Sequence, residues 1–150
     1  MNVNKPDTTP VWVEPDDDLT PLARAVERLD EGLSRYQQDV ADLQIRDGLI
    51  KRFEFTYEIT HKMLKRFLKR ASPSADIFDQ MPFSDLIRTG NAYGLLLGNW
   101  ESWKKYREQS GKTKYSYDEQ TAVGVVQFIP AFLKEAQFLL EQLQKRIDKI

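Results

Sequence analysis

The sequence contains no cysteine and only one histidine, which limits the kinds of site that it can build. Without cysteine, neither a disulfide framework nor a thiolate metal site can form, and a single histidine excludes a site with several imidazole ligands. Carboxylates alone can hold a metal ion, but Asp17 and Asp18 fall in a proline-rich N-terminal segment. Asp118 and Glu119 fall at an expected helix start, where capping is the usual role. We therefore predict no metal, no cofactor and no catalytic carboxylate pair.

The sequence also lacks a strong charge of either sign and a long hydrophobic run. Its 22 basic and 23 acidic residues give a formal net charge of -1, so no overall field draws the molecule onto nucleic acid or a membrane. No apolar run approaches the roughly 18 residues of a membrane span, and the N-terminus lacks the pattern of a signal peptide. We expect a cytoplasmic protein that does not contact the membrane. Its 150 residues suit one domain with a real core.

The N-terminal segment is rich in proline and aspartate. Four of the first 21 residues are proline, which removes backbone donors and disfavours helical geometry. We expect a flexible tail over residues 1–18 and a helical domain over residues 19–150. Val11, Trp12 and Val13 form a small apolar island in the tail, which either docks on the domain or a partner, or stays free.

Apolar residues recur at helical spacing through the domain, and no segment keeps the two-residue alternation of a strand. The expected helices run from Thr20, as the cap, to Val40, then over residues 43–70, 84–92 and 95–111, and finally from residue 119 to the end of the chain. Gly111 is expected to end the fourth helix. Ser116 and Glu119 have the form of a capping box that opens the last helix, in which Pro130 predicts a kink. We predict an all-α, up-and-down bundle of about five helices.

The second expected helix has two apolar faces. One face belongs to the core, whereas Phe55, Ile59 and Met63 form another, which one small bundle does not need to cover. These three residues are therefore our candidates for a dimer or partner interface. His61 lies beside the core face, where packing among apolar residues is the more common role than that of a base or ligand.

Residues 46–68, RDGLIKRFEFTYEITHKMLKRFL, resemble the signature second helix of the nucleotidyltransferase substrate-binding family. The YGLL sequence at residues 93–96, then Trp103 and the YSYDEQTA sequence at residues 115–122, follow in the order typical of that family. The resemblance extends over about residues 20–148. The family is a branch of the HEPN superfamily of all-helical dimers, so the resemblance implies a homodimer. It also implies a small nucleotidyltransferase of the MNT type as partner, in a toxin–antitoxin type pair.

HEPN proteins commonly carry an arginine, four residues, a histidine, one residue and a tyrosine, which in many of them form a metal-independent ribonuclease site at the dimer interface. Counted from the tryptophan of the family, these three positions are Ser110, Tyr115 and Tyr117. Arg107 lies three residues too early to replace the missing arginine. A phenol, with a pKa of about 10, is almost fully protonated at neutral pH, so Tyr115 is a poor substitute for a histidine base. The resemblance therefore implies no catalytic residue of the usual kind.

In related systems the tyrosine of this motif can accept adenylate from the partner nucleotidyltransferase, so Tyr117 is the candidate acceptor. Lys112 and Lys114 are candidate phosphate contacts, which leaves weak RNA binding open. The function that we predict is that of a dimeric partner subunit of a small nucleotidyltransferase, without nuclease activity. One alternative is a divergent HEPN ribonuclease that uses His61 or residues not identified by any motif. Another is a plain helical scaffold whose tail recruits a partner.

Overall fold

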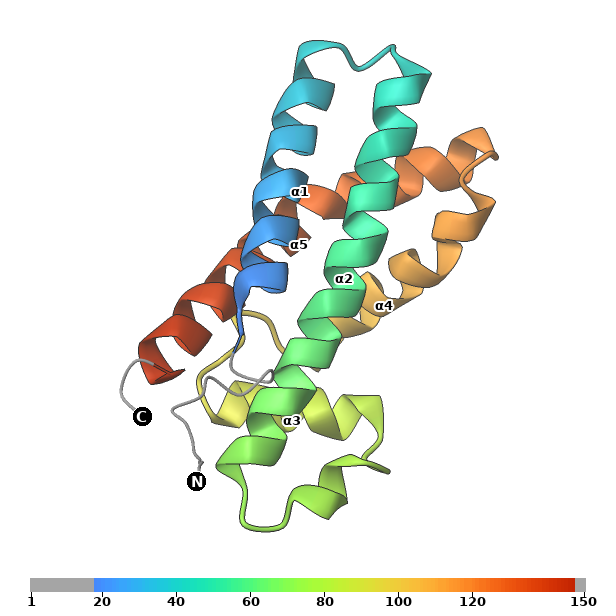
Figure 1. The fold of residues 1–150 in the computed structure, drawn as a ribbon. Coiled ribbons are helices and arrows are strands. Elements are labelled where there is room, and N and C mark those ends of the chain that lie inside the picture. The colour runs from blue at the N-terminus through green and yellow to red at the C-terminus, as the bar shows by residue number, and fades with distance from the viewer. Residues whose placement is uncertain (1–17, 148–150) are drawn as a thin grey trace, which may run out of the picture.

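The computed structural model describes residues 18–147, and all the regular elements in this part of the chain are helices (Figure 1). The α-helices are α1 (Thr20–Gln38), α2 (Leu43–Ala71), α3 (Phe83–Ala92), α4 (Trp100–Lys112) and α5 (Glu119–Ile147). The 3-10 helices are η2 (Ala75–Phe78) and η3 (Thr113–Tyr115). The predicted all-α bundle of about five helices is confirmed. The tail predicted over residues 1–18, with Val11, Trp12 and Val13, lies outside the described residues except for Asp18.

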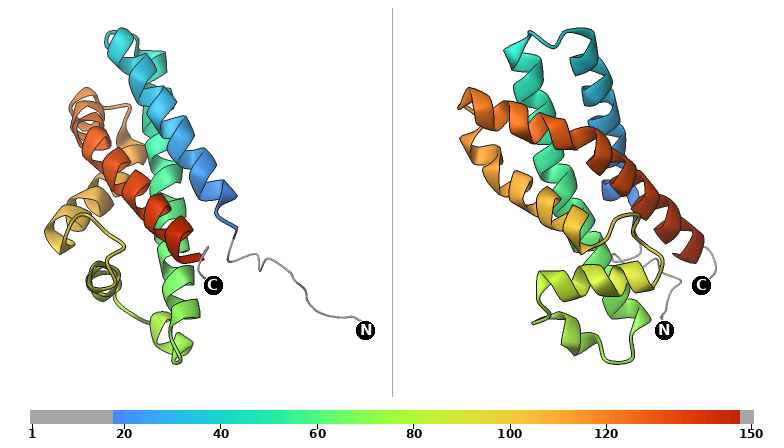
Figure 2. Two further views of the ribbon diagram at one scale, coloured as in Figure 1. Left: turned by 90° about the vertical axis from the view of Figure 1, so that its left-hand side faces the viewer. Right: turned by 180° about the vertical axis from the view of Figure 1, so that it is seen from behind.

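Helices α1 and α2 form an antiparallel hairpin, in which they lie side by side (Figures 1 and 2). Asp42 caps α2, because its Oδ1 accepts hydrogen bonds from the N–H groups of Gln44 (2.9 Å) and Ile45 (3.1 Å). The prediction that the first helix reaches Val40 was wrong. The helix ends at Gln38 and leaves Val40 61% exposed in the connection, where its side chain has no core to face.

Helices α4 and α5 run in opposite directions and pack against the α1–α2 hairpin, with α3 below them in Figure 1. Helix α5 is continuous through Pro130, and Figure 2 shows it bending in its middle. A proline inside a helix removes one backbone hydrogen bond and crowds the preceding turn, so the bend has a local cause. It directs the second half of α5 along α1.

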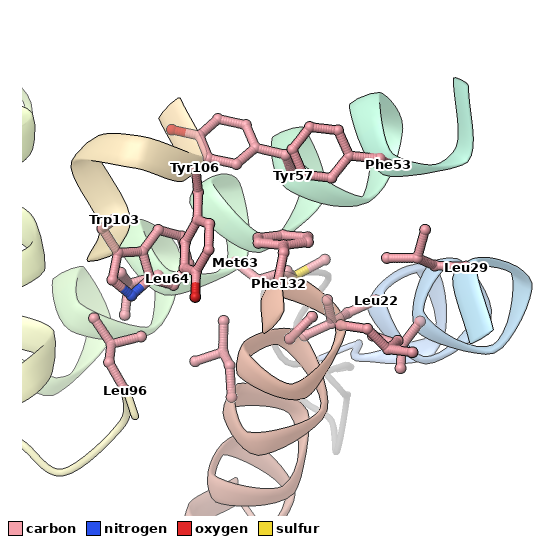
Figure 3. Packing of buried hydrophobic residues seen from close by; sticks show 14 of the residues in the cluster. Leu22, Leu29, Phe53, Tyr57, Met63, Leu64, Leu96, Trp103, Tyr106 and Phe132 are labelled. Atoms are coloured by element: carbon pink, nitrogen blue, oxygen red, sulfur yellow. The ribbon is translucent and has the colours of Figure 1, made fainter. Parts of the chain in front are cut away.

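The core is centred on aromatic side chains from α2, α4 and α5 (Figure 3). Phe53, Trp103 and Phe132 are fully buried. The ring of Phe132 meets those of Phe53 and Tyr106 edge to face, with centroids 5.2 and 5.4 Å apart. This geometry brings the positive edge of one ring to the negative face of another. Phe132 of α5 therefore packs against both α2 and α4.

A charged residue, Glu135 of α5, is 1% exposed and holds the chain between α3 and α4. Its two carboxylate oxygens accept hydrogen bonds from the backbone N–H groups of Leu97 and Gly98, each 2.7 Å long. Burial raises the pKa of this carboxyl, and the two N–H donors act in the opposite direction. Residue 98 has to be glycine here, because a Cβ atom would lie 2.9 Å from Glu135 Oε1 and 2.8 Å from the Cβ of Ser102.

Helix α5 is, by length and composition alone, apolar enough to cross a membrane. Its apolar residues nevertheless belong to the core of the bundle: Val125, Ile129, Phe132 and Leu139 are fully buried. A helix that packs among several others needs a wide apolar surface. Core packing therefore accounts for part of the apolar composition of α5, whose most apolar stretch is 39% buried in the bundle.

Two predicted helix ends differ from the structure. Thr20 is the first residue of α1 rather than its cap, and its backbone N–H donates to Oδ1 of Asp18 at 2.9 Å. Gly111 lies inside α4, which continues to Lys112. Glycine ends a helix by adopting a left-handed backbone, and among the described glycines this conformation occurs at Gly94, with φ of 76°.

The second apolar face of α2 is partly a core surface. Met63 is 4% exposed and belongs to the core cluster, so it offers no surface to a partner, contrary to the interface expected from the sequence. The helical spacing placed Met63 one turn from Ile59, but the broad core of the bundle reaches that far around α2. Phe55 and Ile59 are half-buried and, with Pro21, line a shallow pocket of about 230 Å³. Their role in an interface stays a prediction.

Candidate functional site

The end of α4 and the connection from α4 to α5 carry five of the site residues predicted from the sequence: Ser110 and Lys112 on α4, and Lys114, Tyr115 and Tyr117 in the connection. The first part of the connection is the short helix η3, anchored by the buried Thr113. The hydroxyl of Thr113 lies 3.0 Å from Oε2 of Glu54 on α2 and 2.8 Å from the carbonyl oxygen of Ser110. Glu54 also binds Lys51 at 2.8 Å, which together with Thr113 lowers the pKa of its carboxyl. The connection is therefore tied to α2.

A second anchor holds the start of α5. The buried Arg46, from the RDG sequence at the start of α2, makes two parallel hydrogen bonds of 2.9 Å to the carboxylate of Glu119. Such a paired contact is strong and fixes the relative orientation of both groups. It also lowers the pKa of the Glu119 carboxyl. Sequence analysis missed this pair, although the presence of an arginine on the apolar side of an amphipathic helix was a usable signal.

The capping box predicted from Ser116 and Glu119 does not form, because Glu119 turns to Arg46 instead. Asp118 caps α5: its Oδ2 accepts hydrogen bonds from the N–H group (3.0 Å) and the hydroxyl (2.9 Å) of Thr121. A carboxylate one residue before the helix binds the free N–H groups of the first turn as well as a serine would. The connection and the first turn of α5 are thus held at both ends.

Beside this connection lies a pocket of about 540 Å³. Its lining consists of Gln109, Lys112, Tyr115, Asp118, Gln120, Thr121 and Gly124. Two of the predicted site residues, Lys112 and Tyr115, thus come together there. Gln109 is 8% exposed, and its Oε1 has no hydrogen-bond partner among the described residues. The pocket therefore offers the cation of Lys112, the phenol of Tyr115, several neutral polar groups and the carboxylate of Asp118, and its lining contains no imidazole base.

The other predicted site residues lie outside the lining of this pocket. Tyr117 is 86% exposed, so its hydroxyl is accessible to another molecule. Lys114 is also exposed and places its Nζ 5.9 Å from the centre of the Tyr115 ring. Ser110 is half-buried, and its carbonyl oxygen receives the hydrogen bond from Thr113. The structure thus brings Tyr115 and Lys112 into one pocket and leaves Tyr117 free on the surface.

His61 lies elsewhere, on the part of α2 that faces α3 and α4. Its ring is 4.8 Å from that of Phe83, and the guanidinium carbon of Arg107 lies 4.8 Å from the centre of the same Phe83 ring. Burial, followed by the charges of Lys65 and Arg107, lowers the pKa of His61. Its packing on Tyr57, at 6.5 Å, agrees with the expected place beside the core. The proximity of Arg107 had no signal in the sequence, because the two residues belong to different helices.

The titratable groups of this region differ in what they can do. Burial raises the pKa of Tyr57 to about 12, so its phenol stays protonated at neutral pH. His61, by contrast, is neutral there and able to accept a proton. Within residues 18–147, no group of three or more histidine, aspartate and glutamate side chains is placed to hold a metal ion.

Three comparisons with known proteins agree with this architecture. Residues 17–145 match the protein family described as "nucleotidyltransferase substrate binding protein like". A relative from Haemophilus influenzae named "Probable ribonuclease HepT" is 38% identical over 99 residues, which are 66% of this chain and 67% of the relative. A solved structure from the same organism, described as the fold of a substrate binding domain of a nucleotidyltransferase, has a TM-score of 0.79 and 31% identity. That match covers 85% of this chain and 99% of the other.

The family match takes in all five α-helices, from the residues before α1 to the last turn of α5. It includes the Arg46 that anchors α5 and the connection that carries Tyr115 and Tyr117. The resemblance seen in the sequence is therefore confirmed, and the chain belongs to the nucleotidyltransferase substrate-binding protein family.

Proposed function

We propose that this protein is the partner subunit of a small nucleotidyltransferase, that it acts as a homodimer, and that it has no nuclease activity of its own. Membership of the nucleotidyltransferase substrate-binding family supports the choice of partner. The residues at the HEPN motif support the absence of nuclease activity, because Ser110 supplies no cation for a phosphate and Tyr115 no base for a ribose hydroxyl. We infer that the two proteins form a toxin–antitoxin type pair in the cytoplasm.

Within this proposal, Tyr117 is the residue that the nucleotidyltransferase modifies. Its exposed hydroxyl, in the connection before α5, can enter the active site of another protein without any rearrangement of the bundle. The phenol oxygen attacks the α-phosphorus of a nucleoside triphosphate, expected to be ATP, held by the nucleotidyltransferase. A bond forms from the tyrosine oxygen to this phosphorus, and the bond from phosphorus to pyrophosphate breaks. Pyrophosphate leaves, and the phenol proton passes to a base of the partner or to water.

The charges around Tyr117 suit this reaction. Lys112, the last residue of α4, and Lys114, in the connection, are both exposed, and their ammonium groups offset the negative charge of an incoming triphosphate. Lys112 also lines the pocket with Tyr115, so a phosphate beside Tyr117 has a cation and a polar pocket within the same short segment. This arrangement supports a role in receiving a nucleotide from a partner.

The proposed function is tested by following the mass of the protein in the presence of its cognate nucleotidyltransferase and ATP. We expect the wild-type chain to gain one adenylate per Tyr117, and the Tyr117→Phe variant to gain none, because the attacking oxygen is absent. The matched control is Tyr115→Phe, which removes a hydroxyl two residues away and is expected to leave the modification intact. Adenylation that persists in Tyr117→Phe would exclude this residue as the acceptor.

The ribonuclease alternative keeps one specific observation in its favour, besides the name of the Haemophilus relative. A neutral imidazole and a guanidinium, those of His61 and Arg107, contact the same Phe83 ring. The same preparations decide between the two functions when they are incubated with single-stranded RNA. We expect no cleavage; robust cleavage that survives Tyr115→Phe but disappears in His61→Ala would favour the ribonuclease and contradict our proposal.

The homodimer of this proposal is expected to use the surface around Phe55 and Ile59, which remains half-buried in one chain. Light scattering should therefore report about twice the 17.5 kDa of one chain. Phe55→Glu should shift the protein toward the monomer, because an isolated charge in an apolar interface costs several kcal/mol. Ile77→Glu, a matched change at an exposed apolar residue of η2, should leave the dimer unchanged. A wild-type protein that is monomeric at tens of micromolar would contradict the proposed dimer.

A further inference from the structure

Two basic side chains from different helices contact one aromatic ring, and a third basic residue lies one turn from the first of them. His61 and Lys65 are one turn apart on α2, and therefore neighbours on its surface. Arg107 comes from α4. The ring of Phe83, at the start of α3, lies 4.8 Å from the His61 ring and 4.8 Å from the guanidinium carbon of Arg107. We refer to His61, Lys65, Phe83 and Arg107 as the His61 cluster.

The positive charge of the His61 cluster is not neutralised within the described part of the chain. Neither Lys65 nor Arg107 makes an ion pair with another residue of the range 18–147. The carboxylate of Asp79 binds Lys69 at 2.6 Å. Lys69 is the main cause of the lowered pKa of Asp79, and the charge of Lys65 contributes less. Together with burial, which is the larger cause, the two cations lower the pKa of His61 and disfavour its charged form. Such a group of cations gains stability when an anion enters it.

We propose that the His61 cluster binds a phosphate group carried by a nucleotide or an RNA strand. A guanidinium donates two parallel hydrogen bonds to phosphate oxygens, and an ammonium adds a compact positive charge. The imidazole of His61 supplies a further donor once it is protonated. Phe83 fixes the orientation of the Arg107 and His61 side chains, because both rest on its ring. His61 and Arg107 are therefore pre-positioned by Phe83, and Lys65 adds a positive charge from the next turn of α2.

Binding at this site is coupled to the protonation of His61, with a defined sign. The groups that face the imidazole are Tyr57 and Lys65 on α2, Arg107 on α4 and the uncharged Phe83 at the start of α3. In the free protein, burial and then the two cations keep the pKa of His61 below its usual value. A bound phosphate dianion reverses this influence and raises the pKa. By linkage, phosphate binding is expected to tighten as the pH falls through the pKa range of His61.

The single histidine of the chain gives one imidazole Hε1 resonance in tag-free protein, which makes this coupling measurable by NMR. The probes are inorganic phosphate, ATP and a short single-stranded RNA oligonucleotide, each titrated into the full-length protein at several pH values. We expect saturable binding together with a rise in the pKa of His61. Tightest binding of RNA identifies a nucleic-acid strand as the ligand, and tightest binding of ATP identifies a free nucleotide.

Variants distinguish phosphate binding at the His61 cluster from nonspecific electrostatic binding. Arg107→Gln and Lys65→Gln are each expected to weaken binding about tenfold, because each removes a cation that contacts the phosphate. The matched control is Lys105→Gln, on the same helix two residues from Arg107 and therefore on another side of it. Circular dichroism confirms that each variant is folded. Equal losses in Lys105→Gln and Arg107→Gln, or binding that leaves the pKa of His61 unchanged, would overturn the proposal.

This inference does not depend on the proposed modification of Tyr117. The His61 cluster lies on α2, α3 and α4, whereas Tyr117 lies in the connection before α5. Phosphate binding by the Tyr117→Phe variant is expected to equal that of the wild type. Each proposal can consequently fail while the other stands.

Discussion

Replacement of Phe132 by alanine is expected to lower the free energy of unfolding by about 4 kcal/mol, the largest stability effect that we predict for one residue. Phe132 is fully buried, and its ring contacts those of Phe53, Tyr57, Trp103 and Tyr106. Alanine removes those contacts and leaves a cavity that the surrounding rings, fixed on α2 and α4, cannot move to fill. For a domain of this size, the melting temperature should fall by about 8 to 16 °C.

The matched control for this change is Phe128→Ala, on the same helix. Phe128 is half-buried, so the same truncation removes less buried surface and opens no enclosed cavity. Its effect on the midpoint of urea denaturation should be less than half that of Phe132→Ala. Equal effects of the two substitutions would show that Phe132 is not the point at which α2, α4 and α5 are joined.

The second large effect is expected at Glu135, whose substitution by alanine should cost about 3 kcal/mol. This change leaves the N–H groups of Leu97 and Gly98 without their acceptor and opens a space beside the start of α4. Hydrogen bonds to a charged group are worth more than those between neutral groups, so two of them outweigh an ordinary surface substitution. Urea denaturation measures the change. Glu141→Ala, at an exposed position of the same helix, is the control and should leave the midpoint unchanged.

The pH dependence of this contribution has a definite sign. The pKa of Glu135 in the folded protein lies above the 4.5 of an ordinary glutamate, with burial as the main cause. A raised carboxyl pKa favours the folded state below the unfolded value, and this contribution is lost as the pH rises through the folded value. The stability of the wild type relative to Glu135→Gln should therefore decrease as the pH rises above 4.5. An increase over that range would contradict the assigned direction.

Helix content followed from the sequence because the spacing of apolar residues is a local property. Residues three and four apart share one face of a helix wherever that helix lies in the bundle, so the five α-helices were predictable. The ends of the helices were less predictable, because several polar side chains compete for the same backbone N–H donors. Asp118 rather than Ser116 caps α5, because Glu119 binds Arg46, a residue that lies far away in the sequence. A choice of this kind depends on the packing of α2 against α5.

In the candidate site, too, the sequence predicted what is local and missed what depends on packing. The order of residues in the family motif identified Ser110, near the end of α4, and Tyr115 and Tyr117, in the connection that follows, since the motif is a continuous stretch of sequence. Its pocket was not predictable, because Gln109 and the first turn of α5 line it from helices whose relative positions the bundle sets.

The sequence by itself determined that this chain forms helices, which of their faces are apolar, and to which family it belongs. Tertiary structure alone decided that His61 on α2 meets Arg107 across the Phe83 ring, and that Glu135 faces the backbone of Gly98 rather than water. Apolar periodicity specifies how a helix is oriented about its own axis. It does not specify which residues of another helix lie opposite, because that depends on the distance and crossing angle at which the side chains of the two helices interlock.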